Sequence, residues 1–233
     1  MQPRSFNKKV RHSHISYISM KQNSIIRNTA LAGIFGSALF VMVFTIEGWL
    51  RPGYDACSMY VSALSLGPRG VVQITNFIVS GLLMLIFGRG LAIAFRKANT
   101  SQAGPVLLTI VAAGMFLSGP FVMDPAGTPP AQATVHGLVH GIVGSVVFVL
   151  MPISVLVCYR RLRSEPGWRT FSRWTLAAGV ILTTTLAFFI SATKVPMWHI
   201  IGSEWYGVLQ RLVLIPFMFW VFTLGIALYV KRA

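Results

Sequence analysis

The stretch Asp124-Pro-Ala-Gly-Thr-Pro-Pro-Ala-Gln-Ala-Thr-Val-His136-Gly-Leu-Val-His140 separates two long apolar segments of the chain. Its prolines and glycine favour a turn. The four-residue spacing of His136 and His140 places both on one face of a helix that begins near residue 135. We therefore expect one carboxylate and two imidazoles at one edge of an apolar bundle, in a chain with only five acidic residues.

The composition on either side of this turn is that of an integral membrane protein. Of 233 residues, 55% are hydrophobic and 11% are charged, and no internal stretch has the composition of a soluble domain. A net charge of +15 would favour nucleic acid as a partner of a soluble protein. Here most basic residues flank apolar segments, which is a topology signal, so we expect a lipid bilayer as partner and no nucleic acid.

The apolar segments predict an all-α polytopic fold with six transmembrane helices. At about 1.5 Å per residue, each segment is long enough to cross a hydrocarbon core of about 30 Å. Pro105 suits the first turn of the third helix, and Pro120 should kink or end it. The predicted spans are residues 29–50, 71–95, 105–123, 135–159, 174–193 and 208–230.

The sequence before the first span is polar and basic. We expect residues 1–28 to form a cytoplasmic tail, with Met20 as an alternative native start, and residues 29–233 to form the membrane domain. With six spans, sixteen of the twenty Lys and Arg residues lie on the side of the two termini, which predicts cytoplasmic termini in a bacterial inner membrane. This topology puts Cys57 and Cys158 on opposite sides, so they cannot form a disulfide within one chain.

Polar residues inside the predicted spans gather near their outer ends. Glu47 and Arg51 are one helical turn apart, a spacing that permits an ion pair. Because a buried ionisable group needs a partner or water, we expect these side chains to converge on an outward-facing polar pocket. Arg211 is the expected counter-ion of either Asp124 or Asp55. The pocket residues predicted are Glu47, Asp55, Ser62, Gln73, Asn76, Asp124, His136, His140, Gln210 and Arg211.

Several chemistries suit such a pocket. Asp124, His136 and His140 are residue types that bind zinc, and a metal-bound water there would make the protein a hydrolase of a lipid or lipid-linked substrate. However, a His-x-x-x-His spacing is common in structural hydrogen-bond networks and no glutamate accompanies it. Haem would need His199, since two histidines on one helix face cannot be the two axial ligands. The remaining alternative is a carrier or sensor of a small ligand. Oligomeric state is not predicted.

Five short motifs stand out along the chain: Arg51-Pro-Gly-Tyr54, Val61-Ser-Ala-Leu-Ser-Leu-Gly-Pro-Arg-Gly70, Gln73 with Asn76-Phe77, Asp124-Pro125 with His136-Gly-Leu-Val-His140, and Gly207-Val-Leu-Gln-Arg211. Through these motifs the chain resembles the bacterial domain-of-unknown-function 998 family of six-helix membrane proteins. The resemblance covers about residues 30 to 230 and implies a fold and a membrane location, but no activity. A looser analogy exists with membrane hydrolases that include the alkaline ceramidases, for which Ser62, Asp124, His136 and His140 are the appropriate residue types although helix number differs.

Overall fold

In the residues that the structure describes, the chain folds as a bundle of six α-helices. The structure is a computed structural model that describes the backbone of residues 4–96, 101–194 and 203–231, and the side chains of residues 20–96, 101–193 and 203–231. Short 3-10 helices η1 (Val61–Ser65), η2 (Pro130–Gln132) and η4 (Ser203–Trp205) lie in the connections. The long helices are α1 (Arg4–Leu50), α2 (Gly70–Ala94), α3 (Ala103–Leu117), α4 (Val135–Leu162), α5 (Arg169–Lys194) and α6 (Tyr206–Lys231).

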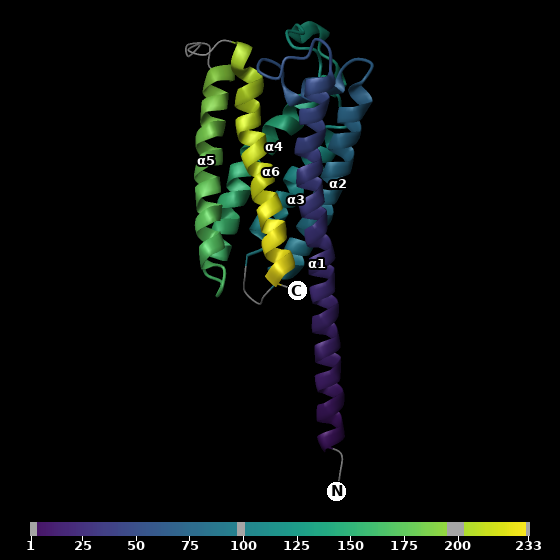
Figure 1. Cartoon of the computed structure of the whole chain (residues 1–233), viewed down its shortest axis with the longest axis vertical. Coiled ribbons are helices and arrows are strands. Elements are labelled where there is room, and N and C mark those ends of the chain that lie inside the picture. Colours follow the sequence, from purple (N-terminus) through teal and green to yellow (C-terminus); the bar gives the residue numbers. More distant parts are fainter. Residues whose placement is uncertain (1–3, 97–100, 195–202, 232–233) are drawn as a thin grey trace.

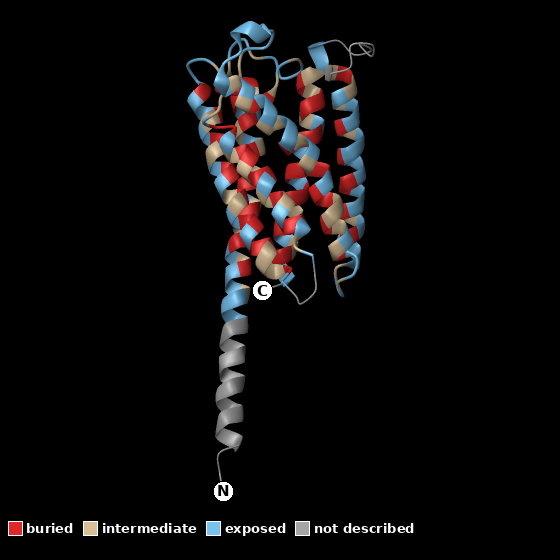
Figure 2. Ribbon diagram, turned by 180° about the vertical axis from the view of Figure 1, so that it is seen from behind, coloured by how far each residue is buried: buried red, intermediate tan, exposed pale blue. Residues whose placement is uncertain are grey.

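The exterior of the bundle is apolar, as expected for a protein in a bilayer. Five helical segments are long and apolar enough to cross a membrane: Met20–Leu50, Gly70–Ala94, Val135–Leu162, Arg169–Thr193 and Ser203–Lys231. Large apolar side chains such as Phe35 and Leu138 are exposed on the outer faces, and Figure 2 shows exposed positions along every helix that is visible from that side. The chain is therefore a multi-pass membrane protein.

The third helix is shorter than the sequence predicted. The expected span at 105–123 is helical only to Leu117. The 15 residues of α3 (Ala103–Leu117) give a helix length of about 22 Å at 1.5 Å per residue. Pro120 follows closely and cannot donate a backbone hydrogen bond, so the helix ends before it, as expected. The apolar residues Phe121 to Met123 continue the hydropathy pattern but not the helix.

The first helix is longer than predicted. Instead of beginning near residue 29, α1 extends back to Arg4, and Figure 1 shows this part projecting beyond the bundle. No proline interrupts the chain between Arg4 and Leu50. The change from basic to apolar composition near residue 28 therefore marks no break in the helix.

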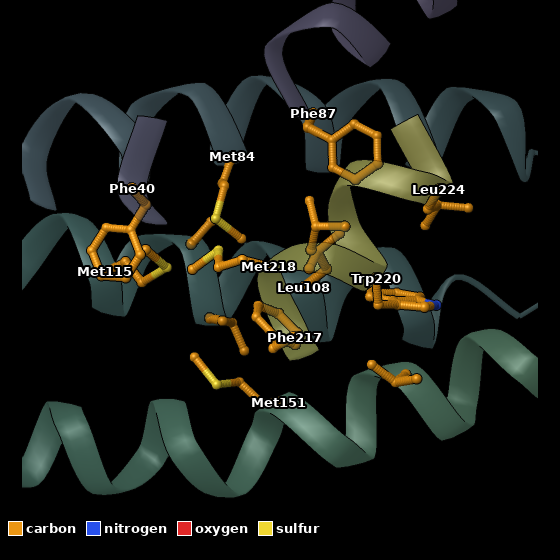
Figure 3. Close-up of a cluster of buried hydrophobic side chains, with 14 of the residues drawn as sticks. Phe40, Met84, Phe87, Leu108, Met115, Met151, Phe217, Met218, Trp220 and Leu224 are labelled. Atoms are coloured by element: carbon orange, nitrogen blue, oxygen red, sulfur yellow. The ribbon is translucent and has the colours of Figure 1, made fainter. Parts of the chain in front are cut away.

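The helices pack in chain order, and α6 closes the ring by packing against α1 (Figure 1). Figure 3 shows the bundle interior, where Phe40 of α1, Met84 of α2, Met151 of α4 and Trp220 of α6 are fully or almost fully buried. Flexible methionine side chains fill irregular space between the aromatic rings. Two connections, residues 51–69 (the first loop) and 118–134, lie at one end of the bundle together with η4, and we call this end the first-loop end (Figure 1).

Candidate functional site

The carboxylate of Glu47 is held by two arginines at the first-loop end. Arg69 donates from Nε to Glu47 Oε1 at 2.9 Å and from Nη2 to Oε2 at 2.6 Å, a bidentate pair. Arg51 Nε lies 3.5 Å from Oε1, which confirms the predicted Glu47–Arg51 pair. Glu47 is only 3% exposed, and its carboxylate raises the pKa of Arg69. We call Glu47, Arg51 and Arg69 the Glu47 triad.

Gln73 and Asn76 form a second buried group, between α1 and α2. Asn76 Nδ2 donates to the backbone oxygen of Phe40 at 3.1 Å and to Gln73 Oε1 at 3.2 Å. Ser80 Oγ donates to Asn76 Oδ1, also at 3.2 Å. These amides therefore join two helices, and they do not line the cavity described below.

The segment Gly207–Arg211 fastens the first loop to the start of α6. Arg211 donates to the backbone oxygens of Ala56 and Met59 at 2.7 and 3.1 Å and to Tyr54 Oη at 2.6 Å. Gln210 Oε1 accepts from Val61 N at 2.7 Å. Within the described residues, Arg211 pairs with neither Asp55 nor Asp124, so the predicted counter-ion role is wrong: its partners are carbonyl oxygens and a phenol.

Gly207 is required where the first loop touches α6. A Cβ atom at this position would lie 2.4 Å from the Met59 oxygen and 2.5 Å from the Ala56 oxygen. The adjacent Val208 N donates to Cys57 O at 3.0 Å. The motif Gly207 to Arg211 is thus a contact surface for loop backbone.

Asp55 stabilises a turn within the first loop. Its carboxylate accepts from Ser58 Oγ at 2.6 Å and from Cys57 N at 2.9 Å. These hydrogen bonds lower the pKa of Asp55, with the Ser58 hydroxyl as the largest cause. Cys57 is exposed and Cys158 is buried, and the two form no disulfide with each other in the described part of the chain.

Thr134 caps the first turn of α4, and Asp124 holds Thr134 in place. The two carboxylate oxygens of Asp124 accept from Thr134 N at 2.9 Å and Thr134 Oγ1 at 2.7 Å, while Thr134 Oγ1 accepts from Gly137 N at 3.0 Å. A carboxylate near a helix N-terminus also interacts favourably with the helix dipole. A Cβ at Gly137 would lie 2.1 Å from Asp124 Oδ2, so glycine is needed beside this cap.

The two histidines of α4 have different environments. His140 is buried, and its Nδ1 lies 2.7 Å from the backbone oxygen of Phe121. His136 is exposed and packs edge-on against the Phe121 ring, 5.5 Å between centroids. Across the described part of the chain, no three His, Cys, Asp or Glu side chains gather as a metal-binding group. The zinc hypothesis therefore stays a prediction without geometric support, and His199 of the haem alternative lies outside the described residues.

One cavity at the first-loop end does bring predicted residues together. It has a volume of about 430 Å³ and lies between the first loop, α4, α5 and the start of α6. Ser62, His140 and Gln210 line it, whereas the other seven predicted pocket residues do not. Its wall is mainly apolar, with Phe148 and Phe189 on α4 and α5. The predicted residues thus separate into several groups, and three share this cavity.

Sequence reasoning missed three residues of these groups. Arg69 lies in a Gly-Pro turn 22 positions from Glu47, and only its place in a family motif singled out this segment. Tyr54 was part of another motif; its half-buried hydroxyl donates to the Tyr60 oxygen at 3.1 Å, and partial burial raises its pKa. Tyr60 lines the cavity, stacks on Tyr206, and has a pKa raised by burial.

The comparisons with known proteins agree with the motif resemblance. Neither a curated protein nor a solved structure matches the chain. Residues 34–227 match a family described as a protein of unknown function, DUF998. These residues include α2 to α5, the part of α1 from residue 34 onward and most of α6, together with all ten predicted pocket residues. The chain therefore belongs to the DUF998 family.

Proposed function

We propose that this protein binds the hydroxyl-bearing head of an amphipathic lipid in the cavity between α4, α5 and α6. The observation that carries the proposal is the state of His140 on the cavity wall. A carbonyl oxygen only accepts, so Nδ1 donates its hydrogen to Phe121 O across 2.7 Å. In a neutral imidazole this leaves Nε2 as an acceptor, which suits a ligand hydroxyl.

The other polar groups of the cavity complement such a head group. The Gln210 amide oxygen is occupied by Val61 N, and in the described part of the chain no hydrogen bond engages its Nε2 donor. Tyr60 and Ser62 add hydroxyls on the side of the first loop. Because burial raises the pKa of Tyr60, its phenol stays protonated at neutral pH and can donate or accept.

The remaining wall suits an apolar chain. Phe148, Leu186 and Phe189 line it, and its volume of about 430 Å³ falls in the usual range for small-molecule sites of about 300–1,000 Å³. Gly141 and Gly144 have no atom within 4 Å of an added Cβ, so they border open space. A chain lying there would continue into the bilayer along the apolar faces of α4 and α5.

The proposal includes a location and an orientation. We place the protein in the bacterial inner membrane with six spans, α3 included, both termini cytoplasmic and the first-loop end outward. Support comes from the excess of Lys and Arg near the termini. The native thiols provide a test, because Cys57 is exposed at the first-loop end and Cys158 is buried. A membrane-impermeant maleimide should label Cys57 in intact cells; labelling only after lysis would reverse the orientation.

Lipid binding is tested with dioleoylglycerol and its 3-O-acetyl derivative, which lacks the free hydroxyl. Purified protein in detergent should gain thermal stability with the first lipid and much less with the second. Gly144→Phe fills the open space and should abolish the gain. Val146→Phe, on an exposed position of the same helix, is the matched control and should keep it.

His140→Phe keeps a ring but removes the acceptor, so discrimination between the two lipids should fall by about tenfold, the effect of about one hydrogen bond. Equal stabilisation of wild type and Gly144→Phe would contradict the proposal. Release of oleate during the assay would instead favour the hydrolase alternative.

A further inference from the structure

A second groove at the first-loop end has a basic wall. Its volume is about 420 Å³, and both Arg51 and Arg69 line it, together with Tyr54, Met59 and the turn at Gly67-Pro68. It shares no lining residue with the cavity of the proposed function. Met59 and Ala63 of the first loop face this groove, whereas Tyr60 and Ser62 line the cavity, so the loop separates the two spaces.

The charges at this groove do not cancel. Two guanidinium groups meet the single carboxylate of Glu47, which leaves one positive charge on the Glu47 triad. Asp55, the other carboxylate of the first loop, does not line the groove, and its oxygens accept from Ser58 and Cys57. The groove is therefore electrostatically suited to an anion.

Some donors of the two arginines are unused. Arg51 Nη1 donates to Leu64 O at 2.9 Å, but Arg51 Nη2 is buried and, in the described part of the chain, has no hydrogen-bond partner. Arg69 uses Nε and Nη2 on Glu47, and its side chain is still 50% exposed. Arg51 Nη2 is closed off from solvent, so the exposed part of the Arg69 guanidinium is the donor that a ligand in the groove reaches first.

The backbone beside the groove adds to this preference. Gly67 and Pro68 lie directly before α2, a helix of 25 residues whose first residue is Gly70. The N-terminal end of a helix carries partial positive charge and favours anions. The groove is also where α1 ends and α2 begins, which is the depth of lipid phosphates if these helices span the bilayer.

We infer that the groove beside the Glu47 triad binds a phosphate group, with Arg51 and Arg69 as its ligands. Glu47 positions both guanidinium groups and reduces their net charge. The same chemistry is offered by the head group of an anionic phospholipid and by free phosphate. The site is independent of the cavity, since Gly144 and His140 take no part in it.

The experiment uses the full chain in phosphatidylcholine nanodiscs at constant ionic strength, with thermal stability as the readout. One arm titrates inorganic phosphate; the other replaces part of the phosphatidylcholine with phosphatidylglycerol. Arg69→Gln removes one ligand, Glu47→Gln removes the competing carboxylate, and Arg173→Gln, an exposed position at the opposite end, controls for net charge.

The two triad variants should change binding in opposite directions. Arg69→Gln should weaken the response about tenfold or more, and Glu47→Gln should strengthen it by a similar factor, since charge-assisted hydrogen bonds are lost or gained. A response to phosphate in phosphatidylcholine alone would identify a soluble anion; one confined to phosphatidylglycerol would identify a lipid head group.

Some results would overturn the site. One such result is no change in thermal stability with either inorganic phosphate or phosphatidylglycerol. The other is that Arg69→Gln and Glu47→Gln respond to these additions in the same way as Arg173→Gln. Should Arg69→Gln not fold, Glu47→Gln alone decides, because a purely structural triad predicts lower stability and no gain in the phosphate response. Gly144→Phe should respond like wild type, so failure of lipid binding in the cavity and failure of this site remain distinguishable.

Discussion

The side of the bundle formed by α1, α2 and α6 differs from the side formed by α4 and α5. The first side contains the Glu47 triad, the buried amides of Gln73 and Asn76, and the carbonyl contacts of Arg211. The second side has open space beside Gly141 and Gly144, and its serine and threonine hydroxyls mostly bond back to their own helices. Polar residues thus fix the structure on the first side, beside the basic groove, while the larger apolar wall of the lipid cavity lies on the second side.

This contrast explains why polarity alone is a poor guide to a binding site here. Most buried polar groups need a hydrogen-bond partner, and most of those on α1, α2 and α6 bond to each other or to the backbone of the first loop, with Gln73 Nε2 as an exception among the described residues. The cavity wall is mainly apolar, and its polar residues come from α4, α5, α6 and the first loop. Substitutions on the first side should therefore lower stability, apart from their effect on phosphate binding in the groove, and those on the second side should affect lipid binding in the cavity.

The largest expected effect is that of Glu47→Ala. It leaves Arg51, whose side chain is 12% exposed, without its carboxylate. Removing one partner of a buried ion pair costs about 3–5 kcal/mol. SDS titration in mild detergent measures the free energy of unfolding. The control Ser145→Ala, on α4, should change this free energy by less than about 0.5 kcal/mol. Equal losses for both variants would remove the contrast between the two sides.

Arg211→Lys should have the next largest effect. A lysine keeps the charge but has no planar fork to reach Ala56 O, Met59 O and Tyr54 Oη together. We expect a loss of about 2 kcal/mol, as for hydrogen bonds to a charged group. Limited proteolysis should also cleave the first loop faster. Arg173→Lys serves as the control, and unchanged proteolysis of Arg211→Lys would show that the loop is held by other contacts.

A pair of glycine substitutions gives a smaller but sharper comparison. Gly207→Ala would place Cβ within 2.5 Å of two loop carbonyls and should cost about 1–3 kcal/mol by overpacking. Gly144→Ala enters open space and should stabilise α4 by up to about 1 kcal/mol through helix propensity. The two are compared by SDS titration. Destabilisation by Gly144→Ala would mean that the space beside α4 is closed in the native protein.

The sequence predicts a helix boundary well where turn residues or arginines follow the apolar segment, and poorly where they do not. The predicted span at 71–95 nearly coincides with α2, and 135–159 lies within α4, because turn residues and arginines bound these apolar segments. The predicted end of the third span at residue 123 was wrong because apolar residues continue past Pro120, whereas α3 ends at Leu117. The long start of α1 was missed because hydropathy locates a span but not the helix that extends beyond it.

The candidate site was only partly predictable for a different reason. The free-energy cost of burying polar groups correctly indicates that Glu47, Asn76 and Arg211 need hydrogen-bond partners, but it does not identify those partners. Most partners turned out to be backbone oxygens, which no residue type reveals. Arg69 meets Glu47 only because the first loop folds back over the end of α1, a long-range contact that spacing along one helix cannot predict.

The smallest expected effect is the pH dependence contributed by Asp55. Its folded pKa is lowered, chiefly by the Ser58 hydroxyl, below the usual value of about 3.9. The folded state therefore binds fewer protons, and the stability from this group is fully present above the unfolded pKa and is lost as pH falls through the folded value. Asp55→Asn should make thermal stability fall less steeply below about pH 4 than in wild type.

Ser58→Ala refines this last measurement. It removes the largest cause of the lowered pKa but leaves the 2.9 Å bond from Cys57 N, so its pH profile should lie between those of wild type and Asp55→Asn. Both residues belong to the first loop, whose position depends on Arg211. In Arg211→Lys the Asp55 turn is local and should survive, so the pH profile should keep its slope while overall stability drops. A flattened profile in Arg211→Lys would instead mean that the turn forms only when the loop is fastened to α6.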